Sequence, residues 1–489
     1  MRLFTRFLML GCGLTTAAAA PDQNAASFGK YWQEFTLGDL AAAHALLRDN
    51  HPGAAPELGD VQFQRALLDA YRLAQQRAAK VANYEGYIAT LAAFGTSFGD
   101  KHIRSTPAFR RELLNWPSFI VARKGSDWIV TDEDPGGEDL KGYRLLSCDG
   151  RPAEAVAKER LGQFKAIWEI QAQQRLAAPW LLIDDGNPFV TPISGCTFAK
   201  GEDIRNISIK WSQKQSSELS PRLRAAAGAG AAGFGVRKFA GGSWISLQSL
   251  GDRAGPVVDE VRKRADELRA SGAVVLDMRG NGGGNSAYGD QIAEALLGAG
   301  LYRAAIRSLE DAEDCPKLWR ASPANIKTLQ EYKAKFGPRL GKDYERETSD
   351  EIDRLTRAVA NGESFSGPVA CKPKTRGPQA SAPLPWPGKF TMVVLTDSLC
   401  FSSCLSVTDR LRRMGATHVG QTTDANTHYM ENRTVLLPSG LSYFSTQQAV
   451  DLGAPRQMGP FIPRLEYNGD IADTAELENW VTEVVRLKP

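Results

Sequence analysis

The sequence of 489 residues predicts an α/β core with a parallel sheet, preceded by an N-terminal helical domain and a small β-rich unit. Three observations support this prediction. Apolar residues recur at helical spacing over 25–114, short β-prone runs fill 115–224, and strands alternate with helices after residue 234. Alternating strands and helices typically form a parallel sheet. The length itself favours several domains over a single core.

The first 20 residues have the pattern of a secretory signal peptide. Arg2 and Arg6 precede an apolar stretch that ends in small residues before Pro21. We therefore expect an exported protein, either periplasmic or secreted. Cys12 follows a glycine, as in a lipoprotein cleavage site, so a lipid anchor at Cys12 is the less favoured alternative. No later segment offers the roughly 20 apolar residues of a membrane span, so we expect no transmembrane segment.

The charges are nearly balanced, with 59 Lys and Arg against 56 Asp and Glu. Both signs are interspersed along the chain instead of forming runs. Nucleic acid is therefore not an expected partner.

Six cysteines remain after the predicted signal peptide, and an even number in an exported chain predicts disulfides. They are Cys148, Cys196, Cys315, Cys371, Cys400 and Cys404. Proximity in the sequence favours pairing Cys315 with Cys371 and Cys400 with Cys404, although sequence alone does not choose among the possible pairings. No cysteine has a second cysteine or a histidine at metal-ligand spacing, so we expect no metal.

The order of the units follows from composition. The helical domain covers 25–114, and the β-rich unit covers 115–224. Residues 225–233 are all Ala or Gly, which predicts a flexible linker. The α/β core is expected in two parts, 234–300 and 388–489. Between them, residues 301–387 are polar and helix-prone, and we interpret them as a helical insertion.

A glycine-rich turn follows the buried strand expected at 273–277. Residues 276–284 read Leu-Asp-Met-Arg-Gly-Asn-Gly-Gly-Gly, and a helix is expected from about Ser286. The backbone N–H groups of Gly283 and Gly284 are unobstructed by side chains and suit an oxyanion. A tight turn without any ligand explains this motif equally well when it is taken alone.

Ser402 lies between a strand expected at 390–395 and a helix expected at 403–414. A serine at such a turn is lifted out of the sheet, and the N–H of Ser403 can assist an oxyanion beside it. Taken alone, a serine here is more often a helix cap than a nucleophile.

Together these motifs resemble a known family. The glycine-rich turn, Ser402 and the later Val419-Gly-Gln-Thr-Thr423 are similar to the catalytic core of the tail-specific, C-terminal-processing serine proteases. Relatives of that family include the tricorn protease core and the repeats of the interphotoreceptor retinoid-binding protein. The resemblance covers about 234–300 and 390–487. It implies a core of the ClpP/crotonase-like αβ sandwich type, Ser402 as nucleophile and no cofactor. Residues 141–150 are similar to the end of a PDZ-like module.

The general base departs from the tail-specific pattern. The family's lysine falls at about Asn426, which cannot act as a base, so a Ser-Lys dyad is not expected. The tricorn branch instead takes a histidine from an Asp-x-His-like element in the helical part. This chain has Phe98-Gly-Asp-Lys-His102, and His102 is the expected base. His428 is the alternative base, because it lies close to the vacant lysine position.

The expected function is that of an exported serine endopeptidase, which cleaves polypeptides through a Ser-His acyl-enzyme mechanism. The acid that orients the base is not identified; Asp451 and Glu466 lie in the right region. A bond between Cys400 and Cys404 would stiffen the turn around the nucleophile, whereas free thiols would indicate redox sensitivity or packing. The alternatives are a non-catalytic protein that binds apolar ligands or peptides, and a hydrolase of small esters or amides.

Overall fold

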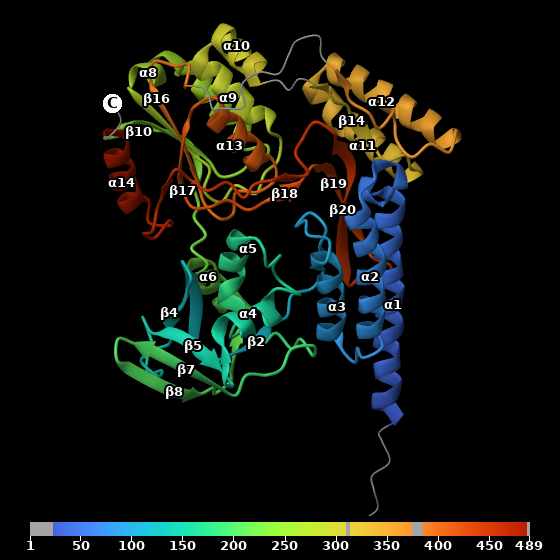
Figure 1. Cartoon of the computed structure of the whole chain (residues 1–489), viewed down its shortest axis with the longest axis vertical. Coiled ribbons are helices and arrows are strands. Elements are labelled where there is room, and N and C mark those ends of the chain that lie inside the picture. The colour runs from blue at the N-terminus through green and yellow to red at the C-terminus, as the bar shows by residue number, and fades with distance from the viewer. Residues whose placement is uncertain (1–22, 310–312, 374–384, 487–489) are drawn as a thin grey trace, which may run out of the picture.

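The structure is a computed structural model that describes residues 23–309, 313–373 and 385–486. The predicted signal peptide, including Cys12, lies outside the described residues. Figure 1 shows the α/β core beside the helices of the N-terminal domain, with the β-rich unit below the core in that view.

The core is built on a six-stranded sheet in the order β10-β11-β12-β16-β17-β22. Its strands are β10 (Phe234–Phe239), β11 (Gly242–Leu247), β12 (Ala273–Asp277), β16 (Thr391–Thr396), β17 (Thr417–Gly420) and β22 (Leu465–Glu466). Only β10 is antiparallel to its neighbour. The predicted parallel α/β sheet is therefore confirmed, and the expected strand at 273–277 has the predicted bounds.

Helices cover both faces of this sheet, which explains why β12 is apolar throughout. Val274 and Leu276 pack in one cluster with residues of α7, α9 and α13, whereas Val275 packs on α14 from the other side. The helices are α7 (Ala254–Lys263), α8 (Ala265–Ala270), α9 (Ala287–Leu297), α13 (Ser403–Arg413) and α14 (Thr474–Arg486). A break at Arg264 separates α7 from α8.

The N-terminal helices share a core with strands from the far end of the chain. They are α1 (Gln23–Asn50), α2 (Val61–Ala78) and α3 (Tyr84–Thr96). Leu47 and Phe94 pack with Phe444 and Val450 of β20 (Ser442–Asp451), and β20 pairs with β19 (Tyr429–Leu436). In Figure 1 these helices lie alongside β19 and β20. The helical domain is therefore not an independent globule.

The expected helical stretch 25–114 ends earlier than predicted. After α3 the chain forms β1 (Ser105–Pro107), which pairs with β20, and then β2 (Leu113–Trp116). The pairing with β20 recruits these residues into the sheet, which local helical spacing could not reveal. As a result, the segment between α3 and β1 runs along the edge of the core.

The middle unit contains an antiparallel sheet in the order β3-β4-β5-β7-β8, with β6 on β5. The strands are β3 (Phe119–Lys124), β4 (Asp127–Glu133), β5 (Arg144–Cys148), β6 (Arg151–Pro152), β7 (Gly195–Lys200) and β8 (Asp203–Ser208), and β9 (Ser212–Gln215) pairs with β2. The unit also carries the helices α4 (Ala153–Leu161), α5 (Gln171–Ala177) and α6 (Ser216–Ala226). Cys148 and Cys196 face each other across β5 and β7 and form a disulfide.

The predicted flexible linker 225–233 is not free. Residues 225 and 226 end α6, and the N–H of Gly230 donates to Asp397 Oδ2 at 3.0 Å. A β-carbon at Gly230 would lie 3.1 Å from the Arg279 side chain. The small residues thus permit a close approach to the core, where composition alone suggested flexibility.

The stretch expected as an insertion contains three helices in its described part, and it also extends the sheet of β19 and β20. It contains α10 (Ala299–Leu309), α11 (Pro323–Leu340), α12 (Lys342–Ala360), β13 (Glu313–Asp314), β14 (Lys317–Trp319) and β15 (Lys372–Pro373). Strand β14 pairs with β20, and a disulfide joins Cys315 to Cys371. This is one of the two pairs that proximity favoured.

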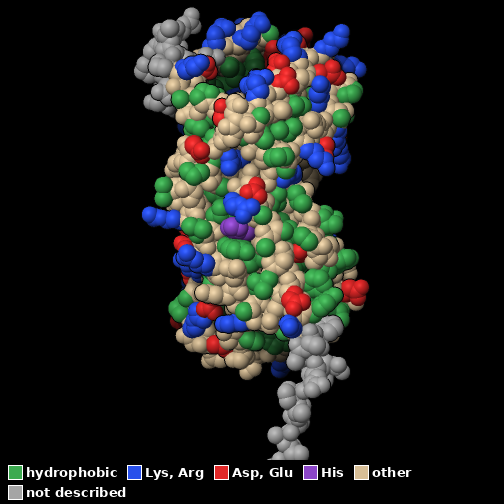
Figure 2. Space-filling view, turned by 90° about the vertical axis from the view of Figure 1, so that its right-hand side faces the viewer, with side chains coloured by type: hydrophobic (Ala, Val, Ile, Leu, Met, Phe, Trp, Pro, Cys, Tyr) green, Lys and Arg blue, Asp and Glu red, His purple; other side chains and the backbone are tan. Residues whose placement is uncertain are grey.

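The surface agrees with the interspersed charge pattern. On the face shown in Figure 2, acidic and basic side chains are scattered among hydrophobic ones. Within residues 23–486, apart from the two internal gaps, no helix is long and apolar enough to cross a membrane.

Candidate active site

Ser402 occupies the turn between β16 and α13, directly before the first residue of that helix. Its backbone is in the left-handed half of conformational space, with φ 57° and ψ −129°. A residue other than glycine adopts such a φ at a cost of about 1–2 kcal/mol. Two links hold the turn: the Cys400–Cys404 disulfide brackets Ser402, and Phe401 N–H donates to Asn281 O at 3.2 Å. The strained turn presents the Ser402 hydroxyl to a groove on the surface of the core.

The glycine-rich turn lies directly against Ser402. Gly283 has φ 104°, and a β-carbon there would lie 2.7 Å from Ser402 Cβ and 3.0 Å from Ser403 N. Its own N–H donates to Asn281 Oδ1 at 2.9 Å. The N–H groups of Gly284 and Ser403 donate to no acceptor in the part of the chain that the structure describes. Gly283 therefore provides room, while Gly284 and Ser403 keep free donors.

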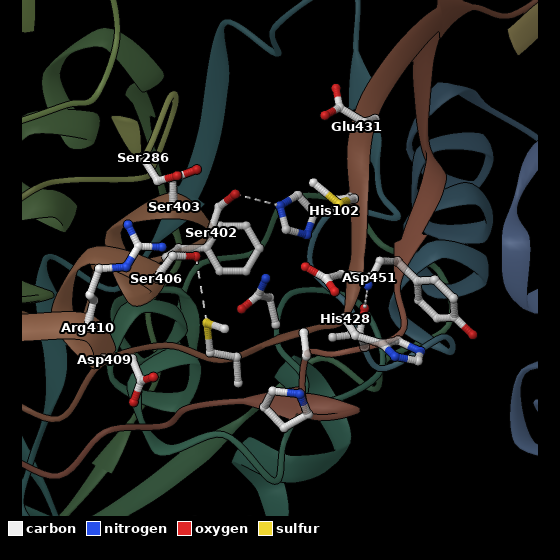
Figure 3. Close-up of a pocket in the computed structure, with 18 of the residues that line it drawn as sticks. His102, Ser286, Ser402, Ser403, Ser406, Asp409, Arg410, His428, Glu431 and Asp451 are labelled. Atoms are coloured by element: carbon white, nitrogen blue, oxygen red, sulfur yellow. Dashed lines mark hydrogen bonds between the residues drawn. The ribbon is translucent and has the colours of Figure 1, made fainter. Parts of the chain in front are cut away.

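His102 reaches Ser402 from the segment between α3 and β1. The distance from His102 Nε2 to Ser402 Oγ is 3.0 Å (Figure 3). Ser445 Oγ on β20 donates to the backbone oxygen of His102 at 2.5 Å, and the Phe401 ring lies 4.4 Å from the imidazole. The docking of the helical domain on β20 is thus what brings His102 and Ser402 together.

Asp100 binds the other nitrogen of the imidazole. His102 Nδ1 lies 2.8 Å from Asp100 Oδ1, which also accepts the His102 backbone N–H. Oδ2 accepts the N–H and hydroxyl of Thr427. Burial alone would raise the pKa of Asp100, but the neighbouring His102 charge and the bonds from His102 and Thr427 lower it on balance. An ionised Asp100 requires a proton on Nδ1, which leaves Nε2 free to accept from Ser402.

Gln447 on β20 connects this site to a second buried histidine. Its Nε2 donates to Asp100 Oδ2 at 2.9 Å, and its Oε1 lies 3.2 Å from His51 Nε2. Since His51 Nδ1 accepts the Gly53 N–H, the proton of the neutral ring is on Nε2 and points at Gln447. Burial lowers the pKa of His51 to about 3, so the ring stays neutral. His51 therefore fixes which end of the Gln447 amide faces Asp100.

The other candidates lie apart from the serine. No hydrogen bond joins His428 to Ser402 among the described residues, and burial lowers the pKa of His428. Asn426, at the vacant lysine position, pairs with β21 (Gln457–Met458) as part of β18 (Asn426–Thr427). Asp451 lies 3.7 Å from Lys317, and Glu466 lies 3.9 Å from Arg175. Neither of the two regional acids contacts His102.

The roles of Asp100 and Gln447 in this network were not predicted from the sequence. Asp100 did carry a signal, because an aspartate two residues before His102 can accept that residue's N–H in an Asx turn. Gln447 carried none, since its place depends on the pairing of β20.

Ser402 and His102 line a groove of about 1570 Å³. Its lining residues come from α9, α10 and α13 and from β19 and the segment around β13 and β14. Ser402 and His102 face each other across the open space in Figure 3. The described residues contain no cluster of three or more His, Cys, Asp or Glu side chains that could hold a metal ion.

Comparisons with known proteins gave one family match and several similar folds. Residues 244–451, from β11 to the end of β20, match the model of peptidase family S41. No curated protein matches the chain. The fold is similar to the crystal structure of mature CPAF, with a TM-score of 0.58 and 16% identity over 93% of this chain and 98% of that one. A structure of mature CPAF complexed with lactacystin gives a TM-score of 0.59 and 15% identity over 93% and 99%.

The family match spans both the glycine-rich turn and Ser402, and the similarity to CPAF extends over the helical domain that carries His102. Residues 244–451 thus match peptidase family S41, and this match supports a serine-type peptidase.

Proposed function

We propose that the protein is an exported endopeptidase in which Ser402, His102 and Asp100 act as a catalytic triad. The observation that carries this proposal is the unbroken line of contacts from Asp100 Oδ1 through the imidazole to Ser402 Oγ, at 2.8 and 3.0 Å. Base and nucleophile within hydrogen-bond reach, with the base oriented by a third group, are the signature of an activated serine. His428 has no such contact and is not needed as a base.

In the proposed mechanism Ser402 Oγ attacks the carbonyl carbon of a peptide bond, and its proton passes to His102 Nε2. Asp100 stabilises the resulting imidazolium through Nδ1–H. The free N–H groups of Gly284 and Ser403 bind the oxyanion. When the C–N bond breaks, His102 returns the proton to the leaving amine. A water molecule then hydrolyses the acyl-enzyme with His102 again as base.

Export is supported by the chemistry of the cysteines. Three disulfides, Cys148–Cys196, Cys315–Cys371 and Cys400–Cys404, join all six cysteines after the predicted signal peptide. Such bonds persist in oxidising compartments. The middle sheet, which was expected to be PDZ-like, is the candidate for holding a substrate tail. No specific observation favours a second function.

The test is covalent labelling of the serine followed by protein cleavage. Wild type is expected to react with a fluorophosphonate probe and to cleave casein, and Ser402→Ala is expected to do neither. Ser406→Ala is the matched control, because Ser406 lines the same groove one turn along α13. Lactacystin, present in one similar structure, serves as a second probe.

Absence of labelling at pH 7.5, together with equal casein cleavage by wild type and Ser402→Ala, would overturn the peptidase proposal in favour of a binding protein. Labelling with turnover of small esters but not of peptides would instead favour the ester hydrolase.

A further inference from the structure

Glu431, on strand β19, has an unusual backbone conformation. Its φ is 61°, in the left-handed region that residues with side chains rarely adopt. In a regular strand, neighbouring side chains point to opposite faces. Here the four consecutive residues from Tyr429 to Asn432 all line the groove. Glu431 therefore lines the same space that holds Ser402 from a left-handed backbone position.

The carboxylate of Glu431 is turned into that space. Figure 3 shows it on the wall beside His102, pointing to the open part of the groove. In the described ranges it makes no ion pair and accepts no hydrogen bond. Burial raises the pKa of Glu431, and the nearby charge of Lys317, whose ammonium lies 3.7 Å from Asp451, lowers it by less. A part-buried carboxylate has thus lost water without gaining a partner.

Other acidic side chains of the groove differ from Glu431 in this respect. Asp451 faces Lys317, Asp409 lies 4.0 Å from Arg413, and Asp290 is bonded to Arg410. Asp314 is exposed and keeps its water. Glu431 is therefore the acid whose charge a bound cation would compensate most.

We propose that Glu431 forms a subsite for a positively charged group of the substrate, and that it directs cleavage to bonds near a lysine, an arginine or a free amino terminus. The proposal rests on the peptidase function proposed above. A cation seated there would neutralise the buried carboxylate and gain a charge-assisted hydrogen bond. Glu431 would thereby determine specificity without taking part in the chemical steps.

The test maps the cut sites in casein by mass spectrometry. For wild type, Lys and Arg are expected to be enriched at one fixed position relative to the cut bond. In Glu431→Gln the preference for basic over neutral residues is expected to fall about tenfold, which is the effect of losing a hydrogen bond to a charged group. Glu431→Asp keeps the charge and is expected to retain most of the preference, whereas Glu431→Lys is expected to favour acidic residues. Asp409→Asn, which removes a paired charge from the opposite wall, is the matched control and keeps the wild-type ratio.

A second measurement uses wild type alone, so it does not depend on the folding of a variant. Peptides carrying lysine at the enriched position are compared with the same peptides carrying acetyl-lysine, and kcat/KM is expected to fall about tenfold on acetylation. Peptides with a free or an acetylated amino terminus separate a side-chain cation from a terminal one. Equal cleavage in both comparisons, or unchanged basic enrichment in Glu431→Gln, would overturn this inference. If wild type cleaved no peptide at all, that result would overturn the peptidase proposal instead.

Discussion

Replacing Asp100 by asparagine tests the central contact of the proposed triad. Asp100 Oδ1 accepts two donors, the N–H and Nδ1–H of His102, and Oδ2 accepts three, from Thr427 and Gln447. An asparagine keeps one oxygen and introduces an NH₂ group. We expect the asparagine oxygen to take the position of Oδ2, where three donors surround it. The NH₂ group then takes the position of Oδ1 and points at His102 Nδ1. That nitrogen must then accept, and the proton moves to Nε2, where it blocks the Ser402 hydroxyl.

The expected loss in kcat/KM for Asp100→Asn is about 10⁴-fold, the size found in kcat when the triad aspartate of a serine protease becomes asparagine. The free energy of unfolding is expected to fall by about 3 kcal/mol, because hydrogen bonds to a buried charge are each worth about 1.5–3 kcal/mol. The assay is cleavage of a fluorogenic casein-derived peptide, with urea unfolding measured on the same samples.

The matched control is Asp39→Asn. Asp39 is also buried, and it joins the helical domain to the core by accepting bonds from Tyr87 and Ser439. It has no contact with His102 among the described residues. A comparable loss of stability with activity within about threefold of wild type is therefore expected for Asp39→Asn. If Asp100→Asn kept wild-type activity, or if both variants lost activity equally, the role given to Asp100 would be refuted.

Three further predictions follow from the same structure. Gly283→Ala is expected to lower kcat/KM in the peptide assay at least about 100-fold, because its β-carbon would lie 2.7 Å from Ser402 Cβ. Gly282→Ala is the control and is expected to stay near wild type, because no atom lies within 4 Å of its β-carbon. His51 has a folded pKa of about 3 against an unfolded value of 6.5, so the unfolded state takes up its proton first and stability falls as the pH drops below 6.5. The resulting loss of stability is about 2 kcal/mol at pH 5. The variant His51→Phe, whose ring can stack on Phe63, should flatten the fall in melting temperature between pH 7 and 5. An unchanged fall in that variant would contradict the pKa of His51. Replacing both cysteines of the Cys315–Cys371 pair by serine is expected to lower stability by about 4 kcal/mol, and replacing the Cys400–Cys404 pair by about 2, from separations of 56 and 4 residues. Urea unfolding measures both losses, and a larger loss for the Cys400–Cys404 pair would contradict that estimate. Peptide turnover should fall more in the variant without Cys400–Cys404, because that bond brackets Ser402.

Local patterns in the sequence were sufficient for the core. The strand at 273–277 is apolar throughout because helices cover both faces of the sheet, so its bounds could be read without the structure. The turn at Ser402 and the helix from Ser403 to Arg413 were equally visible, because strand, turn and helix follow one another directly in the chain. Both cysteine pairs favoured by proximity are present. The third, Cys148–Cys196, depends on the register of β5 and β7.

The surroundings of the serine depend on contacts between distant segments. His102 lies 300 residues before Ser402, and the two meet because α1–α3 share a core with β20. Gln447 and Glu431 owe their places to the pairing of β19 with β20 and to one left-handed residue, neither of which has a local sequence signal. The same holds for residues 225–233, whose composition indicated a linker but whose small size allows hydrogen bonding to the core.

The sequence by itself thus determined the sheet, the turn that carries Ser402 and the glycines beside it, because each depends on residues close together in the chain. The choice of His102 as candidate base came from the family resemblance. Only the tertiary structure decided which acid orients the imidazole, which backbone N–H groups remain free and which carboxylate of the groove lacks a partner. Asp100 is only two residues from His102, but its carboxylate is held in place by distant Thr427 and Gln447. Such contacts between distant segments are fixed by packing and not by local preference.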